Sequence, residues 1–125
     1  GLHPQNFLPL LSAIQQGQNT SVDLINVSSG GVIEGGFPSS VQPGYQIGFA
    51  HEIKNGIKVP ILAGGMLRDI DMIEGILKEN KADLIWLGRE LLRNPYWPLK
   101  ASEYFKYDNK KPQQYKRAEP YFRNV

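Results

Sequence analysis

The chain has 125 residues, which is enough for one ordinary domain and too few for two. It has no cysteine, which excludes disulfide bonds, thiolate metal sites and a cysteine nucleophile within these residues. Residues 100–125 contain seven Lys and Arg and three Asp and Glu, so the net charge of +2 comes from the end of the chain. This charge does not by itself indicate nucleic-acid binding. No apolar segment approaches the ~20 residues that span a bilayer, and no signal-peptide pattern opens the chain. We therefore expect a cytoplasmic protein that acts without nucleic acid or a membrane.

Hydrophobic spacing predicts alternating helices and strands in the first half of the chain. An amphipathic helix within residues 1–18 precedes a first strand at 22–27, an apolar run bounded by turn residues. A loop rich in Gly, Pro and Ser then leads to a helix at 45–55, in which Ile47, Phe49, Ala50 and Ile53 form the expected buried stripe. The second strand is expected at 59–63, with Pro60 tolerated near its start.

The second half of the chain continues this alternation. Asp69 is the expected N-cap of the next helix, which buries Met72, Ile73, Ile76 and Leu77, and the third strand follows at 83–87. A short helix from Arg89 ends before Pro95, a last helix holds Leu99 to Phe105, and residues 106–125 form an extended basic tail. Strands separated by helical segments of about 10–15 residues are typical of βα units with a parallel sheet. We therefore predict an α/β fold in which residues 1–105 form the βα units.

Glycine turns follow two of the predicted strands. Gly64 and Gly65 come directly after the second strand, and Gly88 and Arg89 come directly after the third. In a parallel sheet these turns meet at the carboxyl edge, roughly 5 Å apart in the pairing direction. Backbone N–H groups at such turns, with an arginine beside them, suit a phosphate or another anion. A simpler interpretation stays open, in which the glycines serve close packing and Arg89 is a solvated charge.

Neither histidine is assigned a catalytic role. His3 lies beside Pro4 before the first helix, and His51 lies on the polar side of its helix, so both are expected in solvent. No ligand set at metal spacing accompanies them, and no metal site is predicted. Because the chain also holds no plausible acid–base pair, no catalytic residue is assigned within it.

Six segments carry a family resemblance. They are Val22-Asp23-Leu24-Ile25-Asn26-Val27-Ser28-Ser29-Gly30, Pro43-Gly44-Tyr45-Gln46, Ala63-Gly64-Gly65-Met66, Ala82-Asp83-Leu84-Ile85, Leu87-Gly88-Arg89-Glu90-Leu91-Leu92-Arg93-Asn94-Pro95 and Gln114-Tyr115-Lys116-Arg117. In this order they resemble the C-terminal part of the old yellow enzyme family, especially its bacterial NADPH dehydrogenase (ene-reductase) branch. The resemblance implies the C-terminal half of a flavin-dependent (β/α)8 TIM barrel, with this chain as its last three strands.

The same resemblance implies roles for particular residues. The turns at Gly64, Gly65, Gly88 and Arg89 are implied to hold the phosphate of FMN. The tail residue Arg117 is implied to bind substrate in the active site of a neighbouring subunit. Two serines are candidates for contacts with the ribityl chain of the cofactor, namely Ser28 and Ser29.

The resemblance also implies an activity that this chain cannot perform alone. In the family a hydride passes from NADH or NADPH to FMN and then to an activated C=C bond of a small-molecule substrate. The residues that polarise the substrate lie in the N-terminal half of the barrel, so the chain alone is expected to be inactive. We expect it to work with that missing half and in a homo-oligomer. The alternative is a non-catalytic α/β module that binds a phosphate-bearing ligand or a partner chain.

Half a barrel leaves apolar surface open. Strands covered by helices on one side have an uncovered face and two free edges, which invite association. We expect the partly uncovered residues to include Ile25, Val27, Ile61, Ala63, Ile85 and Leu87. The chain by itself is therefore expected to be oligomeric or partly molten.

Overall fold

The structure is a computed structural model. It describes residues 3–16, 22–31, 34, 41–107 and 113–114. It divides into two compact units, Gly1–Arg93 and Asn94–Val125, which are treated separately below. In the part of the chain that the structure describes, no helix has the length and apolar character needed to cross a bilayer.

The centre of the first unit is a parallel sheet. Its strands β1 (Ile25–Asn26), β2 (Ile61–Ala63) and β3 (Leu84–Ile85) lie side by side in that order, with β2 in the middle. Ile25 pairs with Ile61, and Leu62 pairs with Leu84. The three predicted parallel strands are thus confirmed, although each is shorter than expected because the regular ladder extends over only two or three residues.

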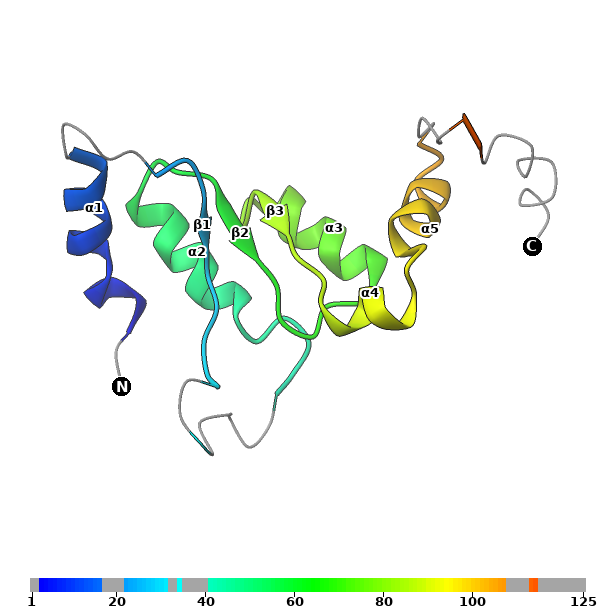
Figure 1. Cartoon of the computed structure of the whole chain (residues 1–125). Helices are drawn as coiled ribbons and strands as arrows, with labels where there is room; N and C mark the ends of the chain where they lie inside the picture. Colours follow the sequence, from blue (N-terminus) through cyan, green and yellow to red (C-terminus); the bar gives the residue numbers. More distant parts are fainter. Residues whose placement is uncertain (1–2, 17–21, 32–33, 35–40, 108–112, 115–125) are drawn as a thin grey trace. The chain divides into compact units, whose positions relative to one another are not determined.

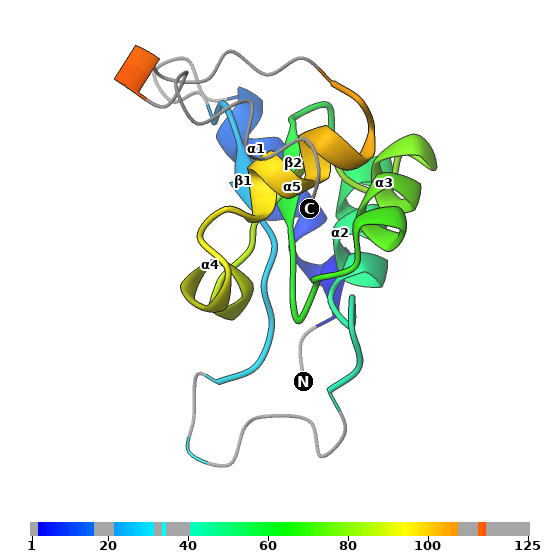
Figure 2. The same ribbon diagram turned by 90° about the vertical axis from the view of Figure 1, so that its right-hand side faces the viewer.

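Two helices cover one face of this sheet, namely α2 (Ile47–Gly56) and α3 (Ile70–Lys78). Figures 1 and 2 show both helices on the same side of the strands. Ile61 and Ala63 of β2 are 0% exposed beneath them. The buried apolar residues of the described chain are Val27, Ile47, Ala50, Ile53, Ile57, Val59, Ile61, Ala63, Leu67, Ile73, Ile76 and Ala82. Burial of this apolar set is the main force that holds the helices on the sheet.

The expected exposure of the strand residues is wrong for Val27, Ile61 and Ala63, which are all buried. Side chains alternate between the two faces of a strand, and the odd-numbered residues of β2 point toward the helices. The opposite face therefore carries the pair Leu62 and Leu84, and Leu84 is 50% exposed. The most exposed apolar strand residue, Leu84, thus belongs to the row that was not expected, whereas Ile25, Ile85 and Leu87 are half-buried and partly uncovered, as predicted.

Two helix residues expected in the core lie outside it. Phe49 is 40% exposed, because it is two residues away from the buried Ile47 and so lies on the other side of α2. Met72 is 37% exposed, whereas its neighbour Ile73 is buried. The N-cap of α3 is as predicted: the Asp69 carboxylate accepts a hydrogen bond from Met72 N at 2.8 Å.

Short helices complete both units. The predicted first helix is present as the 3-10 turn η1 (Pro4–Asn6) and α1 (Leu8–Gln16). Leu8 packs so closely on the end of α2 that a Cβ atom at Gly56 would lie 2.5 Å from its Cδ2. In the first unit α4 (Arg89–Arg93) follows β3, and the second unit holds α5 (Trp97–Tyr104), which begins earlier than expected with Pro98 in its first turn. Most of the predicted tail, 106–125, lies outside the described residues.

Candidate functional site

The carboxyl ends of the three strands point the same way (Figure 1), and the two predicted glycine turns lie at this edge. Both turns adjoin Trp86, which extends the ladder through a hydrogen bond from its N–H to the Ala63 carbonyl at 2.9 Å. A Cβ atom at Gly64 would lie 2.5 Å from two carbons of the Trp86 indole. A Cβ atom at Gly88 would lie 3.7 Å from the Cζ3 atom of the same ring. The structure thus brings Gly64 and Gly88 to one aromatic side chain.

Close packing alone requires glycine at two of these positions. At Gly64 a side chain would meet not only the Trp86 ring but also the Trp86 carbonyl oxygen, at 2.6 Å. Gly65 has a φ of +110°, which side chains of L-residues rarely adopt. Both glycines are buried. The packing interpretation therefore accounts for the residue type at 64 and 65, and it is compatible with a ligand at the open end of the turn.

Gly88 and Arg89 are exposed, and Arg89 begins α4. The Gly88 carbonyl accepts the hydrogen bond from Leu91 N at 2.9 Å, which closes the first turn of this helix. A helix of five residues has few aligned peptide dipoles. Attraction for an anion at this corner must therefore come mainly from the Arg89 guanidinium, since the other arginine of α4, Arg93, pairs with Glu90.

A buried glutamine at the start of α2 was not predicted as part of this edge. Gln46 is 2% exposed, and its Nε2 donates to the Ser29 carbonyl at 3.3 Å and lies 2.5 Å from the Tyr45 hydroxyl oxygen. Its Oε1 is buried with no hydrogen-bond partner among the described residues. Gly44 N donates to the Gly65 carbonyl at 2.8 Å, so the same segment is joined to the turn after β2.

Spacing alone could not have identified this residue. A glutamine near the start of an amphipathic helix is typical of an ordinary surface position, and the only other signal was its place in the segment Pro43-Gly44-Tyr45-Gln46, which carries part of the family resemblance. The indole Nε1 of Trp86 is a second buried polar atom without a partner in the described chain. Buried polar groups normally have partners, so these two atoms are available to a polar group that approaches the carboxyl edge.

The serines after β1 differ in their surroundings. Ser28 is exposed, whereas Ser29 is half-buried and its carbonyl is held by Gln46. Nothing in the described part of the chain tests their role toward a ribityl chain, which stays a prediction. Arg117 lies outside the described residues, and its role also stays a prediction.

The two histidines lie away from the glycine turns. His3 is exposed as predicted, and its backbone N–H donates to Asn6 Oδ1 at 2.7 Å. His51 is half-buried and not fully solvated as expected: its Nδ1 atom is buried with no hydrogen-bond partner among the described residues, and its Nε2 atom lies 3.3 Å from Asn55 Nδ2. His51 instead lines a hollow of about 520 Å³ between α2 and α3, which includes none of the four glycine-turn residues.

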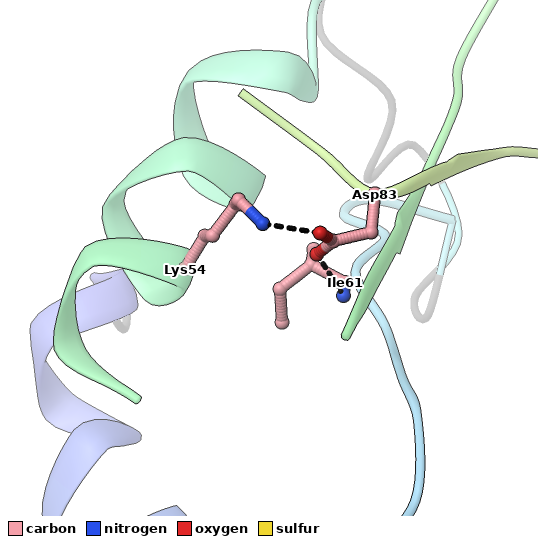
Figure 3. Close-up of polar contacts among 3 residues, drawn as sticks. All are labelled: Lys54, Ile61 and Asp83. Carbon is pink, nitrogen blue, oxygen red and sulfur yellow. Dashed lines mark hydrogen bonds and ion pairs between the residues drawn. The ribbon is translucent and has the colours of Figure 1, made fainter. Parts of the chain in front are cut away.

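A carboxylate ties the strands together at the opposite, amino edge (Figure 3). Asp83 Oδ1 accepts from Lys54 Nζ at 2.5 Å, and Asp83 Oδ2 accepts from Ile61 N at 2.8 Å. The hydrogen bond from Lys54, followed by the one from the Ile61 backbone, lowers the pKa of Asp83 below its usual value. This edge therefore contributes to stability, and it lies apart from the glycine turns at the carboxyl edge.

The arrangement defines a class of protein. Parallel α/β sheets with glycine turns at the carboxyl edge bind cofactors and phosphate-bearing ligands at that edge. A family model described as NADH:flavin oxidoreductase / NADH oxidase family matches residues 9–108. The chain belongs to this family, whose description agrees with the predicted flavin and nicotinamide cofactors.

Three curated relatives are each named NADPH dehydrogenase. Those of Clostridium acetobutylicum and Geobacillus thermodenitrificans are both 38% identical over 118 residues, which cover 94% of this chain and 33% of each relative. That of Bacillus pumilus is 44% identical over 97 residues, which cover 78% of this chain and 28% of the relative. The chain thus spans about a third of the length of the relatives that it matches.

Proposed function

We propose that the chain is the C-terminal part of an FMN-dependent NAD(P)H oxidoreductase of the ene-reductase type. In this proposal the turns at Gly64–Gly65 and Gly88–Arg89 bind the phosphate of FMN. The proposal is supported by membership of the flavin oxidoreductase family and by the relatives named NADPH dehydrogenase. The single observation that carries the site is the meeting of Gly64 and Gly88 at Trp86, one turn being followed directly by Arg89.

The residues at this edge fit a phosphate. Gly88 and Arg89 are both exposed, and Arg89 forms no ion pair with another described residue. A guanidinium can form paired, charge-assisted hydrogen bonds to phosphate oxygens, and the absence of a side chain at Gly88 lets a ligand approach the backbone. The bound FMN supplies the hydride chemistry, while residues of this chain bind and orient it.

The proposed architecture is the C-terminal half of a (β/α)8 barrel, with an extended basic tail after residue 105. The parallel order of β1, β2 and β3 supports it, as do the half-buried Leu62 and the exposed Leu84, which pair on the face away from the helices. In a closed barrel that face would pack against side chains from the remaining strands. The N-terminal half is thus the proposed partner, and catalytic residues are expected there rather than in this chain.

The decisive experiment replaces Arg89 with alanine in the intact enzyme and measures the dissociation constant of FMN. Loss of a charge-assisted contact is expected to weaken FMN binding by ~1.5–3 kcal/mol. Arg93→Ala is the matched control, because Arg93 lies on the same helix but pairs with Glu90. Unchanged FMN affinity in Arg89→Ala would show that the phosphate is bound elsewhere.

The proposed role of Arg117 is tested separately. Truncation of the tail before Arg117 is expected to impair turnover of a substrate with an activated C=C bond and to leave FMN bound, since the arginine is proposed to act in the active site of a neighbouring subunit. Loss of FMN without a change in subunit association would contradict this role. A homo-oligomer in the cytoplasm is part of the same proposal.

A further inference from the structure

The turn after β2 is held in place from one side by the segment that begins α2. Gly44 N donates to the Gly65 carbonyl at 2.8 Å. A Cβ atom at Gly65 would lie 2.9 Å from the Tyr45 ring and 3.3 Å from Gln46 Cδ. Three consecutive residues thus surround one glycine, whose φ of +110° is readily adopted by glycine but rarely by other residues.

Gln46 links this turn to the end of the neighbouring strand. Its Nε2 donates to the carbonyl of Ser29, which follows β1, while its Cδ packs against Gly65, which follows β2. The side chain is almost wholly buried, at 2% exposed, so its position is fixed by its surroundings. A shift of Gln46 would therefore alter the spacing between two of the strand exits.

The amide of Gln46 is not fully satisfied in either orientation. As assigned, Nε2 serves both Ser29 and Tyr45, and Oε1 has no partner in the described chain. If the amide were flipped, Oε1 could accept from the Tyr45 hydroxyl but would face the Ser29 carbonyl, and the nitrogen would be left unpaired. A buried polar atom without a partner is costly, so its position calls for a physical reason.

From these contacts we infer that Gln46 is a positioning residue for the phosphate-binding turn. It acts through Gly65 and Ser29 rather than by touching the phosphate, and it sets the spacing that lets the turn receive the anion. This inference rests on the proposed function, because it concerns the same site. It adds a residue for which hydrophobic spacing gives no functional signal.

The test compares FMN with riboflavin, which lacks the phosphate. Dissociation constants for both are measured by flavin fluorescence with the intact apoenzyme and with Gln46→Met, which keeps the size of the side chain but removes its hydrogen bonds. The expected result is a loss of FMN affinity of about tenfold, the size that follows from one lost polar contact, with riboflavin affinity nearly unchanged. Gln42→Met is the matched control, since Gln42 is exposed and lies in the same segment.

A second variant keeps the test informative if Gln46→Met folds poorly. Tyr45→Phe removes the hydroxyl beside Gln46 Nε2 but keeps the ring that packs on Gly65, so a smaller loss in the same direction is expected. Equal losses for FMN and riboflavin in both variants, or no loss for either, would overturn the inference. If the unmodified enzyme binds FMN no more tightly than riboflavin, the proposed phosphate site is itself wrong.

Discussion

Lys54 Nζ lies 2.5 Å from Asp83 Oδ1, which joins the last turns of α2 to the start of β3. The same carboxylate accepts from Ile61 N, and Asp83 N donates back to the Ile61 carbonyl at 2.9 Å. One aspartate thus connects a helix and two neighbouring strands at the amino edge of the sheet (Figure 3). A backbone N–H that would otherwise lack a partner is satisfied in this way.

Asp83→Ala is expected to lower the free energy of unfolding by about 1–2 kcal/mol, mainly because Ile61 N loses its acceptor. The ion pair with Lys54 adds little, since the Asp83 side chain is 36% exposed and solvent screens it. Urea unfolding of both proteins measures the difference. Asp23→Ala, an exposed position two residues before β1, is the control and should stay near the unmodified protein. Equal stability of the two variants would show that the contacts of Asp83 carry no net energy.

The stability conferred by Asp83 is expected to depend on pH. Its pKa in the folded chain is lowered, first by Lys54 and then by the Ile61 N–H, relative to a value of about 3.9 in the unfolded chain. Its contribution is therefore fully present above about pH 5 and is lost as the pH falls through the folded pKa. The stability difference between the unmodified protein and Asp83→Asn should shrink between pH 6 and the acid range, roughly pH 2–3.

Glu79 does not obscure this measurement. Its pKa is also lowered, by the side-chain hydrogen bond from Lys81, but it titrates in both proteins and its contribution cancels in the difference. A stability difference that is constant with pH would mean that Asp83 has the same pKa in the folded and unfolded chains.

The N-cap of α3 provides a prediction that is independent of the amino edge. Asp69→Ala removes the acceptor for Met72 N and should cost about 1 kcal/mol of stability. Asp69→Asn keeps an oxygen at the same place and should cost much less. Thermal melts of the two variants distinguish loss of the cap from loss of a charge, since both variants remove the negative charge but only one removes the acceptor.

Two glycines with opposite surroundings make a matched pair. Gly64→Ala places a methyl group 2.5 Å from the Trp86 ring and 2.6 Å from its carbonyl oxygen, and should destabilise the chain by roughly 1–3 kcal/mol. Gly75→Ala places it in open space within α3 and should stabilise the chain by about 0.5–1 kcal/mol, because alanine is the better helix former. Equilibrium unfolding reports both changes. A tolerated Gly64→Ala would mean that Trp86 can move away from the turn.

The exposed Leu84 on the open face of the sheet predicts self-association of the chain when it is studied alone. Leu84 is 50% exposed on β3, which is an edge strand of the described sheet. Replacement by threonine keeps β propensity and lowers the apolar area, so Leu84→Thr should reduce the sedimentation-average mass. A monodisperse, cooperatively melting monomer for the unmodified chain would contradict both this prediction and the half-barrel proposal.

The order of elements could be predicted because each strand is a short apolar run bounded by turn residues, and each helix has an apolar stripe. Asp69 could be identified as an N-cap because capping is local: its side chain accepts a hydrogen bond from the backbone of Met72, three residues later. The row of strand residues under the helices could not be predicted. A strand buried on both faces is apolar throughout, so Leu62 and Ile61 are equivalent in the sequence although just one of them faces α2.

The same limit applies to the candidate site. The sequence predicted the glycine turns because glycine directly after a strand is a local signal; they contain Gly64, Gly65, Gly88 and Arg89. Gln46 was not predicted, because its partners are the Ser29 carbonyl, 17 residues earlier, and Gly65, which becomes its neighbour only when the sheet forms. The partial burial of His51 was not predicted for a similar reason, since it depends on α3, whose residues line the same hollow.

The stabilising contacts and the proposed binding turns lie at opposite edges of the sheet, which has a practical consequence. The Lys54–Asp83 connection sits where β3 begins, whereas Gly88 and Arg89 sit where it has ended, so the two sets share a strand but no contact. If the glycine turns bind FMN as proposed, substitutions that stabilise the amino edge can be introduced without altering the residues of the proposed site. A more stable parent protein tolerates substitutions that lower the free energy of unfolding, so more variants of the proposed site would remain folded.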